Sequence, residues 1–151
     1  MSLRVLIADP DEYLLGDYRD YLEQHGFDVV TTTTGLACVW GLRNCAPDVL
    51  VLEPSIPWGG GDGVLAMMHE EHDIPLVPVI VLTYGQDRGV LYRLGPSKID
   101  DYQVKPMRAK RLAERILAVA RRGQFETSPL ENPPSATNQD IAMQHLAGRS
   151  L

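Results

Sequence analysis

Residues 48–53 read DVLVLE, so that four consecutive branched apolar residues stand between two acidic ones. Segments of similar apolar character recur along the chain, and we predict strands at residues 4–8, 28–32, 48–52, 77–83 and 100–104. Short runs with little alternation between apolar and polar residues are typical of parallel strands covered on both faces. The segment at 100–104 is the least apolar of the five and is predicted to lie at the edge of the sheet.

Stretches with helical spacing separate these segments. The clearest covers residues 14–22, whose apolar positions form one face of a helix, with Gly26 placed to end it. Further helices are predicted around residues 36–42, 64–68, 86–94 and 112–119. Parallel strands need crossover connections, which are usually helical. The alternation therefore predicts an α/β fold, a doubly wound five-stranded parallel sheet between two layers of helices.

The length of 151 residues and a hydrophobic content of 44% suit one domain. We place this domain at residues 1–122. Residues 123–151 are polar and rich in proline, and we expect a disordered tail or linker there. Two alternatives stay open: a stand-alone protein with a tail, or a fragment whose output domain is missing.

Composition also narrows the surroundings and partners of the chain. No apolar run approaches the roughly 20 residues of a membrane-spanning helix, and the N-terminal residues lack a signal-peptide cleavage pattern, so we expect a cytoplasmic protein without membrane contact. The formal net charge of −6 argues against nucleic acid as the main direct ligand.

Three polar residues follow or end predicted strands: Asp9, Glu53 and Thr83. In open parallel sheets, sites gather beyond the carboxyl ends of the strands, where the strand order reverses. We therefore expect these three side chains to share one pocket.

Four motifs lie in order on the predicted strand ends: VLIADPDE at 5–12, PDVLVLEPSIP at 47–57, PVIVLT at 78–83 and DYQVKP at 101–106. Together they resemble the receiver domain of bacterial two-component response regulators, of the chemotaxis-receiver kind. The resemblance covers roughly the first 122 residues. It implies a flavodoxin-like (βα)5 fold with strand order 2-1-3-4-5.

The resemblance also assigns roles. Glu53 stands where the family has its phosphate-accepting aspartate, while Asp9 and Asp11 belong to the acidic pocket that holds magnesium in the family. Thr83 matches the switch hydroxyl, and we expect it either to be an ordinary strand residue or to hydrogen-bond Glu53. Lys105 matches the phosphate-pairing lysine.

Two residues of the fifth predicted strand carry open alternatives. Lys105 either merely ends the strand or, as the resemblance implies, points into the pocket to pair with Glu53 or Asp9 across a cis bond to Pro106. Tyr102 is either a packed aromatic residue or the rotating switch residue of the family.

Several departures from the family pattern indicate that this pocket is not phosphorylated. Glu53 carries one methylene more than aspartate, which displaces its carboxylate from the position that phosphoryl transfer requires. Pro10 has no side-chain oxygen where the family has a magnesium ligand. Tyr84 replaces a small residue and would crowd a phosphate donor. Asp9, Asp11 and Glu53 could hold at most a weakly bound cation.

The acidic opening has a purely structural alternative. Asp9 as N-cap, Pro10 at the first helical position and Glu12 at the third would form a capping box without any metal. The run from Trp58 to Gly63 lacks the ending of a phosphate-binding loop and is predicted to be a flexible turn.

These patterns predict a pseudo-receiver, a non-enzymatic signalling module in two-component phosphorelay signal transduction that binds proteins and needs no cofactor. Its partner would be a histidine kinase or an output protein. A homodimer through the fourth helix, fifth strand and fifth helix is a further alternative. The fifth helix is basic at Arg108, Lys110, Arg111, Arg115, Arg121 and Arg122. Two other functions stay open: a magnesium-dependent phosphoacceptor, and the regulatory domain of a DNA-binding regulator that lacks its output domain.

Overall fold

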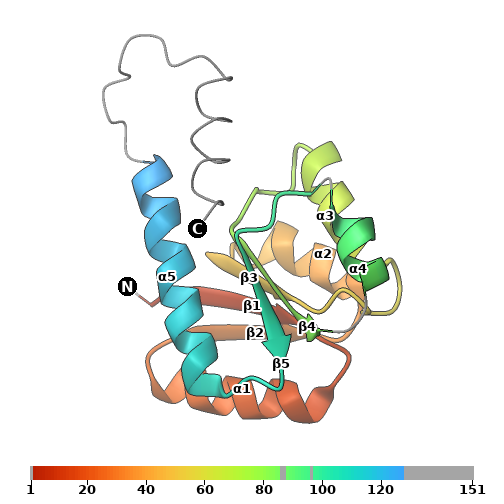
Figure 1. Ribbon diagram of the computed structural model, residues 1–151. Helices are drawn as coiled ribbons and strands as arrows, with labels where there is room; N and C mark the ends of the chain where they lie inside the picture. The colour runs from red at the N-terminus through yellow and green to blue at the C-terminus, as the bar shows by residue number, and fades with distance from the viewer. Residues whose placement is uncertain (1, 86–87, 96, 128–151) are drawn as a thin grey trace, which may run out of the picture.

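The computed structural model describes residues 2–85, 88–95 and 97–127, in which strands and helices alternate along the chain (Figure 1). The strands are β1 (Arg4–Ala8), β2 (Asp28–Thr32), β3 (Val49–Leu52), β4 (Val79–Tyr84) and β5 (Asp101–Lys105). The helices are α1 (Glu12–Gln24), α2 (Gly35–Asn44), α3 (Gly60–Glu70), α4 (Arg88–Leu94) and α5 (Ala109–Thr127).

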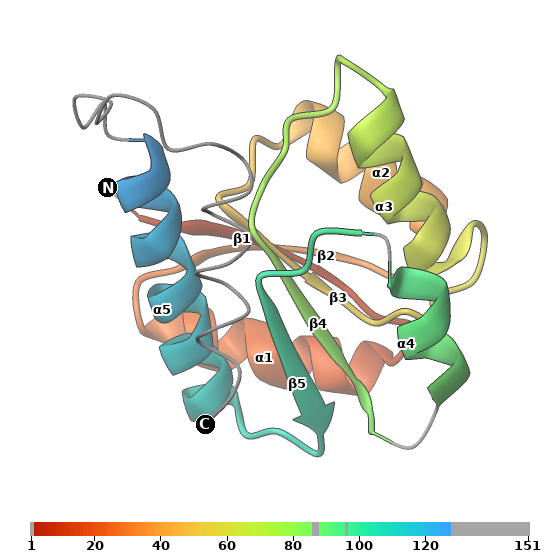
Figure 2. The same cartoon turned by 45° about the horizontal axis from the view of Figure 1, so that its top comes forward.

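The strands form one parallel sheet in the order β2-β1-β3-β4-β5, as predicted, with β5 at an edge. After β1 the chain pairs β2 on one side and then crosses to place β3 on the other. Figure 2 shows the carboxyl ends of β1 and β3 side by side at this reversal of strand order. This is the place where open parallel sheets carry their sites.

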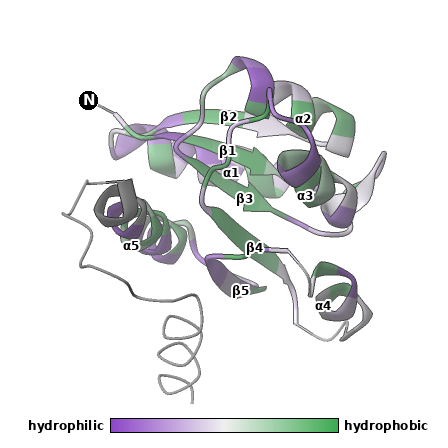
Figure 3. Cartoon of the chain, turned by 90° about the horizontal axis from the view of Figure 1, so that it is seen from above, coloured by the Kyte–Doolittle hydropathy of each residue, from purple (hydrophilic) through white to green (hydrophobic). Residues whose placement is uncertain are grey.

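Two apolar layers cover the sheet. On β1, Val5 and Ile7 pack against the face covered by α1 and α5, whereas Leu6 and Ala8 pack against the face covered by α2, α3 and α4. The four residues of β3 are buried throughout. Figure 3 shows the hydrophobic colouring gathered on the central strands between the helices. Within the described residues, no helix is both long and apolar enough to cross a membrane.

The start of α1 differs from the prediction. Its N-cap is Asp11, whose Oδ1 accepts hydrogen bonds of 3.1 Å from the backbone N–H groups of Tyr13 and Leu14. The prediction of Asp9 as N-cap, with Pro10 and Glu12 inside the helix as a capping box, was therefore wrong by two positions. Asp9 is released from capping and lies at the end of β1.

The start of α3 also corrects a prediction. The helix begins at Gly60, so the last four of the six residues from Trp58 to Gly63 are helical and do not form a flexible turn. Close packing explains the glycines, because a Cβ on Gly61 would lie 2.7 Å from the Cα of Pro54. A helix can approach the preceding loop this closely only without a side chain.

Helix α5 extends to Thr127, so the predicted domain boundary at residue 122 falls within this helix. Its apolar residues Leu112, Ile116 and Val119 pack on the sheet at the four-residue and three-residue spacing expected of one helix face. The remainder of the predicted tail, residues 128–151, lies outside the described residues.

Candidate functional site

The carboxyl edge of the sheet gathers four buried polar side chains, each supplied by a different strand. Asp9 follows β1, Glu53 follows β3, Thr83 lies in β4 and Lys105 ends β5. Their exposed fractions are 3%, 5%, 5% and 7%, respectively, and they are the buried polar residues among those the structure describes. Buried charges are costly unless they are paired, so this cluster requires an internal arrangement of partners.

Lys105 is the positively charged partner of the two buried carboxylates. Its Nζ lies 2.5 Å from Oδ2 of Asp9, as a hydrogen-bonded ion pair, and 3.6 Å from Oε1 of Glu53. The prediction that Lys105 points into the acidic pocket is confirmed, and Asp9 is its nearer partner. The peptide bond from Lys105 to Pro106 is cis. Two carboxylates thus share one ammonium group.

Glu53 is only half satisfied. Its Oε1 accepts a hydrogen bond of 3.2 Å from Oγ of Ser55, whereas its buried Oε2 has no hydrogen-bond partner among the described residues. Buried polar atoms nearly always have a hydrogen-bond partner, so the unpartnered Oε2 of Glu53 is an unusual feature of this pocket.

The predicted hydrogen bond between Thr83 and Glu53 is absent. Both residues are described, yet Oε1 of Glu53 is bound by Ser55 and Lys105 and its Oε2 by nothing. Oε1 of Glu53 faces Lys105 and Ser55, and neither oxygen of Glu53 hydrogen-bonds Thr83.

The two residues predicted to obstruct the pocket lie at its surface. Tyr84 is 62% exposed at the end of β4, with its ring centroid 5.2 Å from Nζ of Lys105, within the range of a cation–π interaction. Pro10 is exposed beside Asp9. Tyr84 therefore stands beside the ammonium group that a phosphoryl group would need to approach.

Tyr102 lies partly buried on β5 and packs against the core that α2, α3 and α4 cover. The arrangement matches the packed alternative. The second alternative, Tyr102 as a rotating switch residue, stays a prediction.

Three carboxylate oxygens of the pocket already have hydrogen-bond partners, whereas Oε2 of Glu53 has none among the described residues. Asp9 uses Oδ1 to accept a 2.9 Å hydrogen bond from the N–H of Asp11, and Oδ2 to bind Lys105. Asp11 uses Oδ1 to cap α1, and Pro10 offers no side-chain oxygen. Magnesium demands near-octahedral oxygen ligands. Among the described residues no group of three or more acidic, His or Cys side chains is arranged to hold a metal ion.

Sequence reasoning missed two residues of this region. Ser55 binds Glu53, and its position two residues after Glu53 in the same loop was the available signal. Tyr18 was counted as an apolar position of α1, but its hydroxyl donates a 2.8 Å hydrogen bond to the carbonyl of Met107, directly after Pro106. Burial raises the pKa of Tyr18 to about 12, and the charge of Asp9 adds to this shift.

The fold and the pocket define a class: an open parallel sheet with a lysine and carboxylates at the switch point. The chain matches the family described as response regulator receiver domain over residues 5–117, and it belongs to that family. Such domains act in two-component signalling and interact with proteins such as kinases or output domains.

Curated relatives include a probable transcriptional regulator, ycf27, from Pyropia yezoensis, with 30% identity over 132 residues, covering 87% of this chain and 53% of that protein. The DNA-binding response regulator MtrA of Mycolicibacterium smegmatis is 28% identical over 130 residues, covering 86% of this chain and 56% of that protein. The chain thus spans about half the length of these relatives.

Solved structures support the fold. A CheY-like receiver domain protein from Methanospirillum hungatei superposes with a TM-score of 0.75 at 21% identity, covering 83% of this chain and 99% of that one. At this identity the likeness concerns the fold alone.

Proposed function

We propose that this chain is a receiver domain that signals by binding a protein partner and does not accept phosphate. The supporting observation is that the charged groups of the pocket pair with one another: Nζ of Lys105 lies 2.5 Å from Oδ2 of Asp9 and 3.6 Å from Oε1 of Glu53. In phosphoryl transfer the positioned cations must neutralise the incoming phosphoryl oxygens. Here the lysine already has two carboxylate neighbours, and Glu53 presents its carboxylate one methylene further along than aspartate would.

The same arrangement favours a module without a resident metal and without enzymatic activity. Both oxygens of Asp9 are engaged, and the capping oxygen of Asp11 serves the backbone of α1. Glu53 supplies about one negative charge where an aspartyl phosphate would carry about 1.5 to 2. The signalling state would therefore be a fixed one that only partly resembles a phosphorylated receiver.

Incubation of the full chain with a small phosphodonor and magnesium, followed by intact mass measurement, tests this proposal. We expect the mass to stay unchanged. An adduct of about 80 Da, the mass added by a phosphoryl group, would contradict the proposal and support the alternative of a phosphoacceptor.

The variant Glu53→Asp separates the contribution of the acceptor from that of its surroundings. We expect no adduct from this change alone, because Pro10 still offers no metal ligand and Tyr84 still stands beside Lys105. Rapid phosphorylation of Glu53→Asp would show that neither residue obstructs the pocket. The triple variant Glu53→Asp, Pro10→Asp, Tyr84→Ala is the matched comparison.

For the partner surface, we propose the face formed by α4, β5 and α5. Tyr92 on α4 and Val104 on β5 are exposed apolar side chains there, and basic residues of α5 accompany them. If a second copy binds this face, analytical ultracentrifugation should show a dimer that Val104→Asp dissociates. Leu36→Asp, at an exposed apolar residue of α2, is the control. A dimer insensitive to Val104→Asp would place the interface elsewhere.

The second candidate function is the regulatory half of a DNA-binding regulator. It is suggested by MtrA, which is named a DNA-binding response regulator and of which this chain covers 56%. The net charge of −6 argues that the present residues do not bind duplex DNA themselves. Fluorescence anisotropy with a mixed-sequence duplex at low salt should show no binding. Salt-dependent binding would overturn the expectation of no direct nucleic-acid contact.

A further inference from the structure

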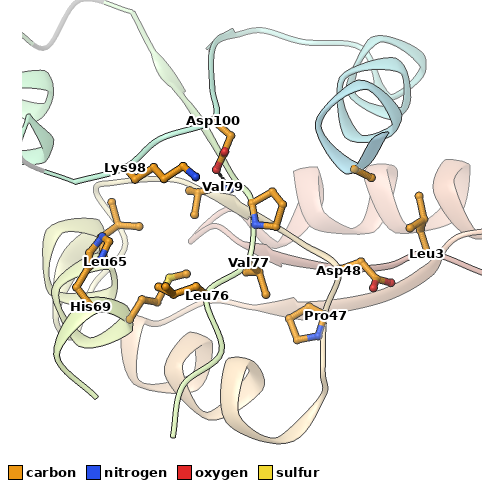
Figure 4. Close-up of a pocket in the computed structure, with 13 residues that line it drawn as sticks. Leu3, Pro47, Asp48, Leu65, His69, Leu76, Val77, Val79, Lys98 and Asp100 are labelled. Atoms are coloured by element: carbon orange, nitrogen blue, oxygen red, sulfur yellow. Dashed lines mark hydrogen bonds between the residues drawn. The ribbon is translucent and has the colours of Figure 1, made fainter. Parts of the chain in front are cut away.

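The amino edge of the sheet, opposite the acidic pocket, carries an open cavity of about 480 Å³ (Figure 4). Leu65 and Met68 of α3 form one wall, and Ala120 of α5 lies on the other side. Leu76 and Val77 from the segment before β4 line the cavity between these helices. The proposed function uses no part of this cavity.

The lining is apolar where the cavity meets solvent. Leu76 is 70% exposed at its rim, and Val77 beside it is half-buried. The charged residues Asp48, Asp100 and Lys98 lie around the margin. A volume of this size suits a few aliphatic side chains.

We propose that residues 141–146 of this same chain, IAMQHL, cover the groove. This segment contains three large aliphatic residues within six positions, Ile141, Met143 and Leu146. Between residues 128 and 140, by contrast, Leu130 is the one large aliphatic residue, amid prolines and polar residues. The sequence therefore offers one apolar anchor after α5, preceded by a polar spacer.

The geometry of α5 favours an occupant from the same chain. Ala120 lines the groove, and the helix continues for seven residues to Thr127, a rise of about 10 Å. Fourteen further residues lead to Ile141, and 14 residues can span at most about 46–50 Å when fully extended. The spacer is thus long enough to return to the groove.

The tether also compensates for the small contact area. Segments joined by short flexible linkers meet their sites at effective concentrations in the millimolar range. A contact by three aliphatic side chains that would be too weak between separate molecules is populated under these conditions.

A nitroxide placed at Gln144→Cys, in a Cys45→Ser background of the full chain, tests the proposal by methyl NMR. Cys38 is buried and does not compete for the label. We expect a selective loss of intensity for the methyl groups of Leu65, Met68 and Leu76, with Leu36, at the start of α2 on the carboxyl edge of the sheet, unaffected. The loss should disappear in Leu76→Asp, an exposed position whose change leaves the fold intact, and in Ile141→Asp combined with Leu146→Asp. The matched control Leu130→Asp should retain it.

Three outcomes overturn the proposal. Unselective or absent broadening shows that the segment does not cover the groove. Broadening that appears in a mixture of labelled and isotopically enriched molecules assigns the groove to a second copy. A small amphiphile retained in native mass spectra, with unbroadened methyl groups, assigns it to a small ligand. None of these results depends on whether Glu53 accepts phosphate, so the test is independent of the proposed function.

Discussion

The two acidic residues that flank β3 serve opposite purposes. Asp48 precedes the strand at the amino edge of the sheet and is exposed, whereas Glu53 follows it at the carboxyl edge and is 5% exposed. Asp48 and Arg4 exchange two hydrogen bonds: Arg4 N–H donates to Oδ2 of Asp48 at 2.8 Å, and Asp48 N–H donates to the carbonyl of Arg4 at 2.7 Å.

The same pair of hydrogen bonds occurs at the start of β5. Asp100, directly before β5, accepts the N–H of Val79 with Oδ2 at 2.8 Å, and its own N–H donates to the carbonyl of Val79 at 2.9 Å. At the amino edge, then, aspartates satisfy the first N–H of a neighbouring strand, which would otherwise have no ladder partner. Their carboxylates are structural.

At the carboxyl edge the side chains serve no neighbouring strand in this way. Glu53 contacts Lys105 and Ser55 and leaves Oε2 without a partner. An acidic residue beside an apolar strand therefore has a different role at each end of the strand. At the amino end it satisfies the backbone of a neighbouring strand, and at the carboxyl end it is part of the buried pocket. Among the described residues, only the carboxyl edge of the sheet buries charged side chains, so changes there should cost more stability.

The largest expected effect comes from Lys105→Met. This variant keeps much of the side-chain volume but leaves Asp9 and Glu53 buried without a cation, and we expect the free energy of unfolding to fall by about 3–5 kcal/mol. Urea denaturation measures this loss. Arg43→Met, which removes an exposed ion pair with Asp73 at 2.9 Å, is the control and should cost no more than about 1 kcal/mol. Equal losses would mean that the pocket is no more sensitive than the surface.

A second test separates the two carboxylates of the pocket. Asp9→Asn weakens the 2.5 Å pair with Lys105, and we expect it to cost about 2 kcal/mol. Glu53→Gln removes the more distant charge, 3.6 Å away, and should stay within about 1 kcal/mol of the wild type. The reverse ranking would make Glu53 the principal partner of Lys105.

The sequence predicted the fold and most of the pocket for a physical reason. Strands β1 and β2 have the predicted bounds, because each is a short run of mostly branched residues that begins at a charged residue. Lys105 was assigned to the pocket from its motif. Which acidic residue pairs with it could not be predicted, because Asp9, Asp11 and Glu53 have the same charge and differ only in three-dimensional position. Capping by Asp11, two positions later than expected, is what releases Asp9 for Lys105.

Glycines and hidden polar atoms explain the remaining differences. A flexible turn was predicted for the run from Trp58 to Gly63, yet α3 begins at Gly60, and Gly61 lies too close to Pro54 to carry a side chain. Tyr18 and Ser55 looked like an apolar helix position and a loop residue because their partners, Met107 and Glu53, are set by tertiary contacts.

A third prediction concerns Tyr18, which connects α1 to the loop after β5. Tyr18→Phe loses the hydrogen bond to Met107 and should cost about 1 kcal/mol at neutral pH. The folded pKa of about 12 exceeds the ordinary value of 10.0, so above pH 10 the unfolded state loses its proton first. Wild-type stability should fall by a further 1–2 kcal/mol or so between pH 10 and 12.

Denaturation curves of Tyr18→Phe should lack that additional decline, whereas Tyr13→Phe, at an exposed tyrosine of the same helix, should keep it. If Tyr18→Phe declines as steeply as the wild type over this pH range, the buried hydroxyl is not the titrating group.

The smallest expected effect lies at the amino edge. Asp48→Ala removes the acceptor of the Arg4 N–H while leaving the backbone bond from Asp48 to the Arg4 carbonyl, and we expect a loss of about 0.5–1 kcal/mol because water can reach this exposed edge. Asp48→Asn keeps a side-chain carbonyl as acceptor and should restore most of the loss. If Asp48→Asn instead destabilises as much as Asp48→Ala, the carboxylate acts through its charge, and the distinction between the structural amino edge and the charged carboxyl edge fails for β3.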